Sequence, residues 1–257
     1  MIRLAALNSV YQTGLRSPMD EAILSHEHPG VARYSRVDEI PFDFVRRRVS
    51  VVVESGGERL LITNGAPESV LPLCTSVKLE GLVKILDSIA TEQARELFRR
   101  LSAQGYRVLA VGYRTVGRRD AYGVVDECDL TLVGFAAFLD PAREDVAATI
   151  AALRHDGVAV KILTGDNELV TERICAGVGL ATGTIVLGTE VDTMSDPALA
   201  AVAERTTVFA RVSPTQKNRI VLALRSRGHV VGCLHQFRRN VPLNRNFKPK
   251  PLPRIRG

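Results

Sequence analysis

The sequence predicts an α/β protein of two domains, in which an antiparallel sheet with helices is followed by a parallel sheet. A β-branched run at 49–53, a Ser-Gly-Gly turn and a second apolar run at 59–63 have the pattern of an antiparallel hairpin. From residue 130 onward, short apolar runs alternate with helical patterns, which is typical of parallel strands joined by right-handed crossovers. A length of 257 residues is sufficient for two hydrophobic cores.

The first part begins with a partly helical segment at 1–34 and continues through the hairpin to a short helix that starts at Pro67. A repeat of apolar residues over 91–103 predicts a helix that ends at Gly105. Further strands are predicted at 106–113 and 130–139.

The second part alternates helices with strands. Asp140 is predicted to cap a helix that has Pro141 at its first position and ends at Gly157. The remaining predicted elements are, in order, a buried strand at 158–163, a helix at 168–175, a strand at 185–187, a helix at 197–205, a strand at 207–212, a helix from Ser213-Pro214 to about Arg227 and a strand at 229–234.

The strand at 158–163 ends in a polar loop, Thr164-Gly165-Asp166, around which this part is organised. Ligands of open α/β sheets lie outside the carboxyl ends of strands, which is where this loop falls. Gly165 lets backbone approach a phosphate, Thr164 offers a hydroxyl, and Asp166 offers a carboxylate for a metal or a sugar. The helix that follows could direct its N-terminus at an anion. Taken alone, the same three residues are also compatible with a plain polar turn.

Phe42 and the basic triplet 46–48 lie just before the β-branched run. An aromatic ring beside several arginines suits adenine stacking and phosphate binding. The alternative is a core phenylalanine beside a solvated basic edge, and these residues alone favour that alternative.

The net charge of +6 comes entirely from the C-terminal tail, residues 235–257, which has seven basic and no acidic residues. Removing those seven from the 34 basic residues leaves 27 against 28 acidic residues in the rest of the chain. The folded body is therefore not a basic nucleic-acid binder, and no nucleic-acid partner is expected. The tail is basic and Pro-rich, and its composition predicts disorder.

Neither a secretory signal nor a membrane span is predicted, because the longest apolar run, at 130–139, is far shorter than a bilayer span. The chain is expected to be cytoplasmic. The four cysteines fit no zinc spacing, no metal site is predicted, and reduced thiols are expected at Cys74, Cys128, Cys175 and Cys233.

The assembled motifs resemble those of the P-type ATPases, and most closely those of the bacterial magnesium-transporting group. The stretches at 7–14, 40–48 and 65–68 resemble that group's nucleotide-binding domain. Asp-Pro-x-Arg at 140–143, Thr-Gly-Asp at 164–166 and Phe-Ala-Arg-Val-Ser-Pro-x-Gln-Lys at 209–217 resemble its phosphorylation domain, a haloacid-dehalogenase-like parallel sheet. The resemblance implies a nucleotide-binding domain at 1–136, a partial phosphorylation domain at 137–234 and the tail at 235–257.

The resemblance also implies a nucleotide site. Phe42 resembles the residue that stacks on adenine, and Asp20 resembles an acidic residue near the adenine amino group. Arg47 matches a basic nucleotide-contacting position, which Arg48 could fill instead. The implied set of nucleotide-binding residues is Asp20, Phe42, Arg47, Arg48, Gly65, Arg107 and Asp166, in which Arg107 would reach the ATP phosphates.

For the phosphorylation domain, the resemblance implies that Thr164 holds the transferred phosphoryl group and Lys217 neutralises its charge. Arg211 would support this site. Asp140 and Arg143 correspond to a hinge motif. ATP and Mg²⁺ are the cofactors that the family uses.

The sequence departs from the family in the parts that carry the chemistry. It contains neither the Asp-Lys-Thr-Gly-Thr that is phosphorylated nor the Gly-Asp-Gly-x-Asn-Asp that supplies magnesium ligands, and Asn64 replaces a nucleotide-site lysine. We therefore expect a truncated relative with weak ATP binding and no turnover. Its second domain should be only marginally stable, because a central strand would lack its partner.

Two other hypotheses remain open: a small haloacid-dehalogenase-type phosphatase, for which no Asp-x-Asp is evident, and a non-enzymatic interaction protein that acts through the basic tail. The expected partners are adenine nucleotide and a complementing fragment of the same ATPase. The full-length family is embedded in the inner or plasma membrane.

Overall fold

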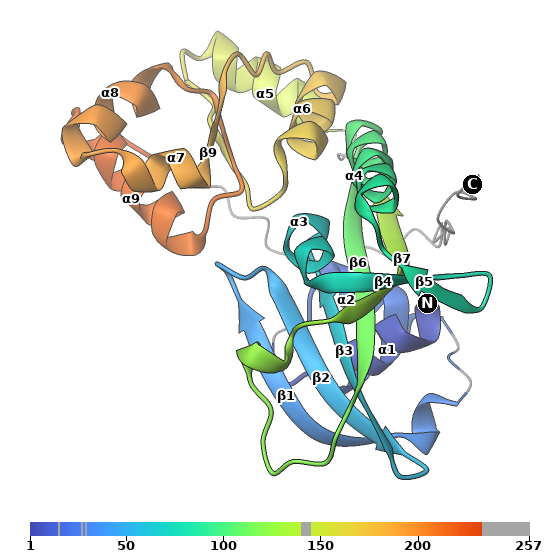
Figure 1. Ribbon diagram of the computed structural model, residues 1–257. Helices are drawn as coiled ribbons and strands as arrows, with labels where there is room; N and C mark the ends of the chain where they lie inside the picture. The colour runs from blue at the N-terminus through green and yellow to red at the C-terminus, as the bar shows by residue number, and fades with distance from the viewer. Residues whose placement is uncertain (15, 27, 29, 140–144, 233–257) are drawn as a thin grey trace. The chain divides into compact units, whose positions relative to one another are not determined.

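The computed structural model describes residues 1–14, 16–26, 28, 30–139 and 145–232. These form two compact units (Figure 1), Met1–Leu101 with Val108–Leu139, and Ser102–Arg107 with residues 145–232. The sequence predictions for Leu15, Asp140, Pro141, Arg143, Cys233 and the tail at 235–257 lie outside the described residues.

The first unit is built on a mixed, mostly antiparallel sheet of seven strands, which confirms the predicted fold class for this part. In spatial order the strands are β1 (Ser35–Asp43), β2 (Arg48–Ser55), β3 (Glu58–Gly65), β6 (Tyr106–Val116), β7 (Leu130–Leu139), β4 (Cys74–Leu79) and β5 (Leu82–Ile85). The predicted hairpin is confirmed, since β2 and β3 pair antiparallel with Val51 opposite Ile62. β4 and β7 form a parallel pair.

The helical segments described in this unit are α1 (Ile2–Tyr11), α2 (Pro18–Leu24), α3 (Pro67–Val70), α4 (Ser88–Ala103) and the short 3-10 turns η1 (Val31–Arg33), η2 (Leu71–Leu73) and η3 (Val124–Asp126). Helix α1 lies against β2 and β3, and buries Leu7 with Val51 and Ile62 (Figure 1). The short helix at Pro67 is confirmed. Helix α4 begins at Ser88 rather than at 91, because Asp87 accepts a hydrogen bond from the N–H of Ala90 at 2.8 Å.

Strands β1, β4 and β5 are additional to the predicted ones. β5 is exposed along its whole length, and β1 contains Pro41, so neither shows the apolar alternation that identifies a strand. They form because each has a neighbour to pair with: β2 for β1, and β4 for β5.

The second unit contains a three-stranded parallel sheet in the order β8 (Ile162–Leu163), β10 (Val208–Ala210) and β9 (Ile185–Leu187). The predicted parallel pairing is confirmed. The helices described here are α5 (Val146–His155), α6 (Glu168–Gly177), α7 (Gly188–Thr193), α8 (Asp196–Arg205) and α9 (Pro214–Ser226). Ser195 and Ser213 cap α8 and α9, and α7 is additional to the predicted elements.

Two predictions for this unit are wrong. The buried strand at 158–163 is reduced to the two residues of β8, and Val158 is 48% exposed, because β8 is an edge strand of the described sheet with only β10 beside it. Residues 229–232 form no strand, since no described strand pairs with them. Helix α5 begins at Val146 with Asp145 at its N-cap. No helix among the described residues is both long and apolar enough to cross a membrane.

Candidate functional site

The turn between β1 and β2, here called the arginine turn (residues 43–48), is organised by Asp43. Its carboxylate accepts hydrogen bonds from the backbone N–H groups of Arg46 and Val45, each at 2.7 Å. These two bonds, that of Arg46 first, lower the pKa of Asp43 from its ordinary value. The Asp43 carbonyl also accepts from the N–H of Arg47 at 2.6 Å. Asp43 therefore fixes the backbone at positions 45–47 of the turn.

Arg47 lies in the left-handed region, with a φ of 49°. A non-glycine residue in this region carries a cost of about 1–2 kcal/mol, so its surroundings must impose it. The Arg47 carbonyl accepts from the N–H of Ala66 at 3.0 Å, and its guanidinium lies 3.9 Å from the carboxylate of Glu68. The segment after β3 therefore holds Arg47 from the other side.

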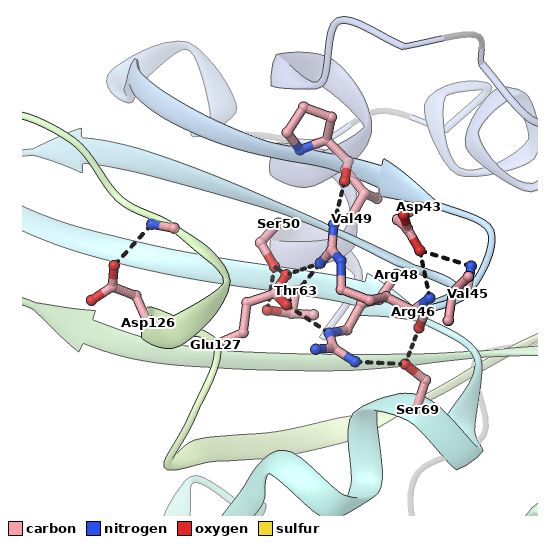
Figure 2. Close-up of polar contacts among 12 residues, drawn as sticks. Asp43, Val45, Arg46, Arg48, Val49, Ser50, Thr63, Ser69, Asp126 and Glu127 are labelled. Carbon is pink, nitrogen blue, oxygen red and sulfur yellow. Dashed lines mark hydrogen bonds and ion pairs between the residues drawn. The ribbon is translucent and has the colours of Figure 1, made fainter.

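Arg46 and Arg48 converge on Glu127, which follows η3 (Figure 2). Arg46 Nη1 donates to Glu127 Oε2 at 2.8 Å and to Oε1 at 3.0 Å, and Arg48 Nε donates to Oε2 at 2.7 Å. Ser50 Oγ donates to Oε1 at 2.7 Å. The Glu127 side chain is completely buried, so its charge is compensated within the protein. The Arg48 side chain is thus bound to buried Glu127, whereas that of Arg47, the residue between Arg46 and Arg48 in the sequence, approaches Glu68.

Gly65 closes the site from β3. It pairs with Arg48 in the sheet, and an added Cβ would lie 2.5 Å from Arg48 Cβ and 2.8 Å from the carbonyl oxygen of Arg47. Only a glycine permits this approach, so Gly65 shapes the arginine turn through its lack of a side chain.

Phe42 is not a core residue, because its side chain is 50% exposed at the end of β1. Its ring meets that of Phe44 edge-to-face, with centroids 5.2 Å apart. Phe44 is itself 59% exposed. The Phe42 ring is therefore half-exposed beside the arginine turn, where a ligand ring could reach it.

Asp20 is buried and engaged within the N-terminal segment. Ser9 Oγ donates to Asp20 Oδ1 at 2.7 Å, and the backbone N–H and hydroxyl of Ser17 donate to Oδ2 at 2.8 and 2.6 Å. Asp20 thereby closes the capping box of α2. These contacts give it a clear structural role in joining α1 to α2.

Asn64 is also buried, with only 2% of its surface exposed. Its side chain lies on the face of the sheet opposite to that of the neighbouring Thr63, whose hydroxyl is hydrogen-bonded to that of Ser50. Asn64 Nδ2 donates to the carbonyl of Ala5 in α1 at 3.2 Å. Asn64 is therefore a contact between the sheet and α1.

In the second unit the structure brings three predicted residues together after β8. Arg107 Nη2 donates to Asp166 Oδ2 at 2.9 Å, and Thr164 Oγ1 lies 3.2 Å from the same oxygen. Thr164 is held through its backbone, because its N–H donates to the carbonyl of Phe209 and its carbonyl accepts from Val212, each at 3.0 Å.

Arg211 joins the same network and, like Arg47, lies in the left-handed region, with a φ of 57°. Its N–H donates to the Asp166 carbonyl at 2.9 Å, and its Nε donates to Glu168 Oε2 at 2.6 Å. Lys217 lies half-buried on the first turn of α9, whose N-cap, Ser213, directly follows Val212. The backbone bond from Val212 to Thr164 thus places the segment carrying Lys217 next to the loop carrying Thr164.

Sequence reasoning does not identify Glu127, Ser50 or Glu168 as residues of these networks. Each is an ordinary polar residue outside any motif, and its role depends on which guanidinium the fold brings to it. The described residues contain no cluster of three or more His, Cys, Asp or Glu side chains that could hold a metal ion.

Comparison with known proteins places the arginine turn within a family domain. Residues 14–145 match the family model described as P-type ATPase, cytoplasmic domain N. Relatives named magnesium-transporting ATPase, P-type 1, are 46% identical over 248 residues in Salmonella typhimurium and 43% identical over 241 residues in Escherichia coli. Each alignment covers 91% of this chain and 27% of the relative.

A calcium-transporting ATPase 1 from Bacillus cereus is 32% identical over 200 residues, which cover 77% of this chain and 22% of that relative. The chain therefore spans about a quarter of the length of the curated relatives it matches.

Proposed function

Because this chain belongs to the P-type cation-transporting ATPases, we propose that its first unit binds adenine nucleotide on the surface formed by Phe42 and the arginine turn. One observation carries the proposal: a half-exposed aromatic ring, that of Phe42, lies near the end of β1, and five residues further on Arg47 is held in a left-handed conformation. Strained residues of this kind persist where the surrounding structure imposes them, often at ligand sites.

In this site Phe42 supplies the stacking face for adenine, and Arg47 supplies the positive charge for the phosphates. Arg47 is a better candidate than Arg48, because the Nε of Arg48 is engaged by buried Glu127. Asn64 adds no charge and is committed to α1, so we expect weak binding, with a Kd of about 1 mM.

Titration calorimetry of the 257-residue chain with ATP tests this function. We expect saturable binding, and a loss of about tenfold in affinity in Phe42→Ala, because base stacking contributes about 1–3 kcal/mol. Leu82→Ala is the matched control, since Leu82 is an exposed apolar residue on β5, at the other edge of the sheet. Absence of ATP binding at millimolar concentration, or equal losses in both variants, would contradict the proposal.

For the second unit we propose that the loop after β8 handles a phosphoryl group, with the Thr164 hydroxyl as donor and Lys217 as the neutralising charge. The link between the Thr164 and Val212 backbones supports this, since it joins the two segments concerned. Magnesium fits the described residues less well: Thr164 and Asp166 offer two oxygen ligands, and no three-residue cluster accompanies them. We therefore assign no step to a metal ion.

We also propose magnesium as the cation of the transport activity to which this chain relates. The relatives named for magnesium are 43–46% identical, whereas the relative named for calcium is 32% identical. On this proposal the two units act at the cytoplasmic side of a membrane, and a complementing chain or segment supplies the phosphorylated aspartate.

A further inference from the structure

We propose that Glu127 is a positioning residue for the nucleotide site. By holding Arg46 and Arg48, it keeps Arg47 and the end of β1 in the geometry that receives the nucleotide. This inference rests on the proposed nucleotide binding in the first unit and adds to it a residue that makes no ligand contact of its own.

Glu127 acts through other residues, because its side chain has no exposed surface. Both carboxylate oxygens are occupied: Oε1 accepts from Arg46 and Ser50, and Oε2 accepts from Arg46 and Arg48. A buried carboxylate with this many donors is fixed in place. Glu127 therefore holds the side chains of Arg46 and Arg48 at fixed positions next to the arginine turn.

The route to Arg47 runs through its two neighbours in sequence. Figure 2 shows that the side chains of Arg46 and Arg48 both reach the carboxylate of Glu127. Arg47, which lies between them in the sequence, adopts the left-handed conformation. Ser69 also binds both arginines, because its hydroxyl donates to the carbonyl of Arg46 and accepts from Arg48 Nη1. A strained conformation needs such convergent restraints, and Glu127 is the restraint that both arginines share.

A second route leads to the aromatic ring. Arg46 Nη2 donates to the carbonyl of Pro41 at 2.7 Å, and Pro41 immediately precedes Phe42 in β1. The guanidinium that Glu127 holds therefore also fixes the backbone that carries the stacking ring. The carboxylate consequently couples the adenine-binding and the phosphate-binding sides of the proposed site.

The charges explain why a neutral residue would not serve. Two guanidinium groups approach within hydrogen-bond distance of the same carboxylate, and without its charge they would repel each other and turn toward solvent. They would then cease to restrain Arg47.

The test is Glu127→Gln in the 257-residue chain, which removes the charge and keeps the size. We expect ATP affinity to fall by about tenfold, the effect of losing a charge-assisted contact. The double variant with Arg47→Ala should lose less ATP affinity than the sum of the two single losses, because the part of the Glu127 effect that acts through Arg47 is already lost in Arg47→Ala. In the nucleotide-free chain, amide exchange at Ala66 and Arg47 should accelerate, since the turn loosens.

Glu54→Gln is the matched control, because Glu54 is ion-paired with Arg59 at 2.7 Å at the far end of β2. It should change neither ATP affinity nor exchange at Ala66. If Glu127→Gln does not fold, Glu127→Asp replaces it: this change keeps the charge but is too short to reach both arginines, so the same losses are expected.

The outcomes separate the two proposals. No ATP binding by the unaltered chain overturns the nucleotide site and this inference with it. ATP binding that Glu127→Gln and Glu127→Asp leave unchanged, or losses that add fully to that of Arg47→Ala, overturn this inference alone. Unchanged exchange at Ala66 and Arg47 likewise overturns it, whether or not ATP binds.

Discussion

Gly65 has no room for a side chain, since an added Cβ would lie 2.5 Å from Arg48 Cβ and 2.8 Å from the Arg47 carbonyl oxygen. Both neighbours are parts of the constrained turn and cannot move aside without shifting it. We expect Gly65→Ala to lower the free energy of unfolding by about 1–3 kcal/mol and to weaken ATP binding. Urea denaturation and calorimetry measure the two effects.

Gly117→Ala is the control for this prediction. Gly117 follows β6 in the same unit, and an added Cβ there would meet nothing within 4 Å. The free energy of unfolding should be nearly unchanged in this variant. Equal stability of Gly65→Ala and the unaltered chain would show that the turn is not as tightly packed as the distances indicate.

Asp43 gives the arginine turn a dependence on pH. Its carboxylate has a pKa below the ordinary 3.8, because it accepts backbone hydrogen bonds in the folded state. The stabilisation is therefore complete above pH 3.8 and is lost as the pH falls through the lower folded pKa. An NMR titration of the Asp43 carboxyl carbon should give a folded pKa below 3.8, and a value at or above it would contradict the assigned bonds.

At the scale of the element, α9 depends on its N-cap. Ser213 Oγ accepts from the N–H of Gln216 at 3.3 Å, and Gln216 Oε1 accepts from the N–H of Ser213 at 2.8 Å. Ser213→Ala should therefore destabilise the second unit by about 1 kcal/mol, measured as a shift of its unfolding midpoint in urea. This change also loosens the turn that carries Lys217.

Ser195→Ala provides the comparison within the same unit. Ser195 caps α8 through a single longer bond of 3.4 Å to the N–H of Ala198, without a reciprocal side chain. The loss in Ser195→Ala should be smaller than that in Ser213→Ala. A reversed order would mean that the capping box contributes little to α9.

At the scale of the whole molecule, the 257-residue polypeptide is expected to form no phosphoenzyme. Its sequence contains no Asp-Lys-Thr-Gly-Thr to accept the γ-phosphoryl group, and its described residues hold no three-ligand metal cluster. Incubation with γ-labelled ATP followed by acid precipitation should leave no label on the chain. Labelled protein from a sample that also binds ATP would contradict this expectation.

The two units should also differ in stability. The described part of the second unit has a sheet of three short strands, and the stretch that leads into β8 is exposed at Val158, whereas the described part of the first unit has a sheet of seven strands. Hydrogen exchange should be fast at 158–161 and 229–232 and slow in β2 and β3. Protection across 158–161 in the monomeric chain would refute this prediction.

The sequence alone determined the α/β class, the hairpin of β2 and β3 and the parallel sheet. It also determined the family, through short motifs that keep their order along the chain. These features depend on local physical chemistry: β-branched runs, glycine turns and residues that a loop requires. Such signals can be read within about ten residues.

Only the tertiary structure decided the length of β8, the pairing of β1, β4 and β5, and the role of each arginine in the turn. Arg46, Arg47 and Arg48 are indistinguishable as residue types, but Glu127, about 80 positions away along the chain, binds two of them and leaves the third in a strained conformation. The same applies to Asp20 and Asn64, whose side chains are committed to Ser9 and Ala5. Residues distant in sequence supply these partners, and a buried charge or amide must take whichever partner the fold brings within hydrogen-bond distance.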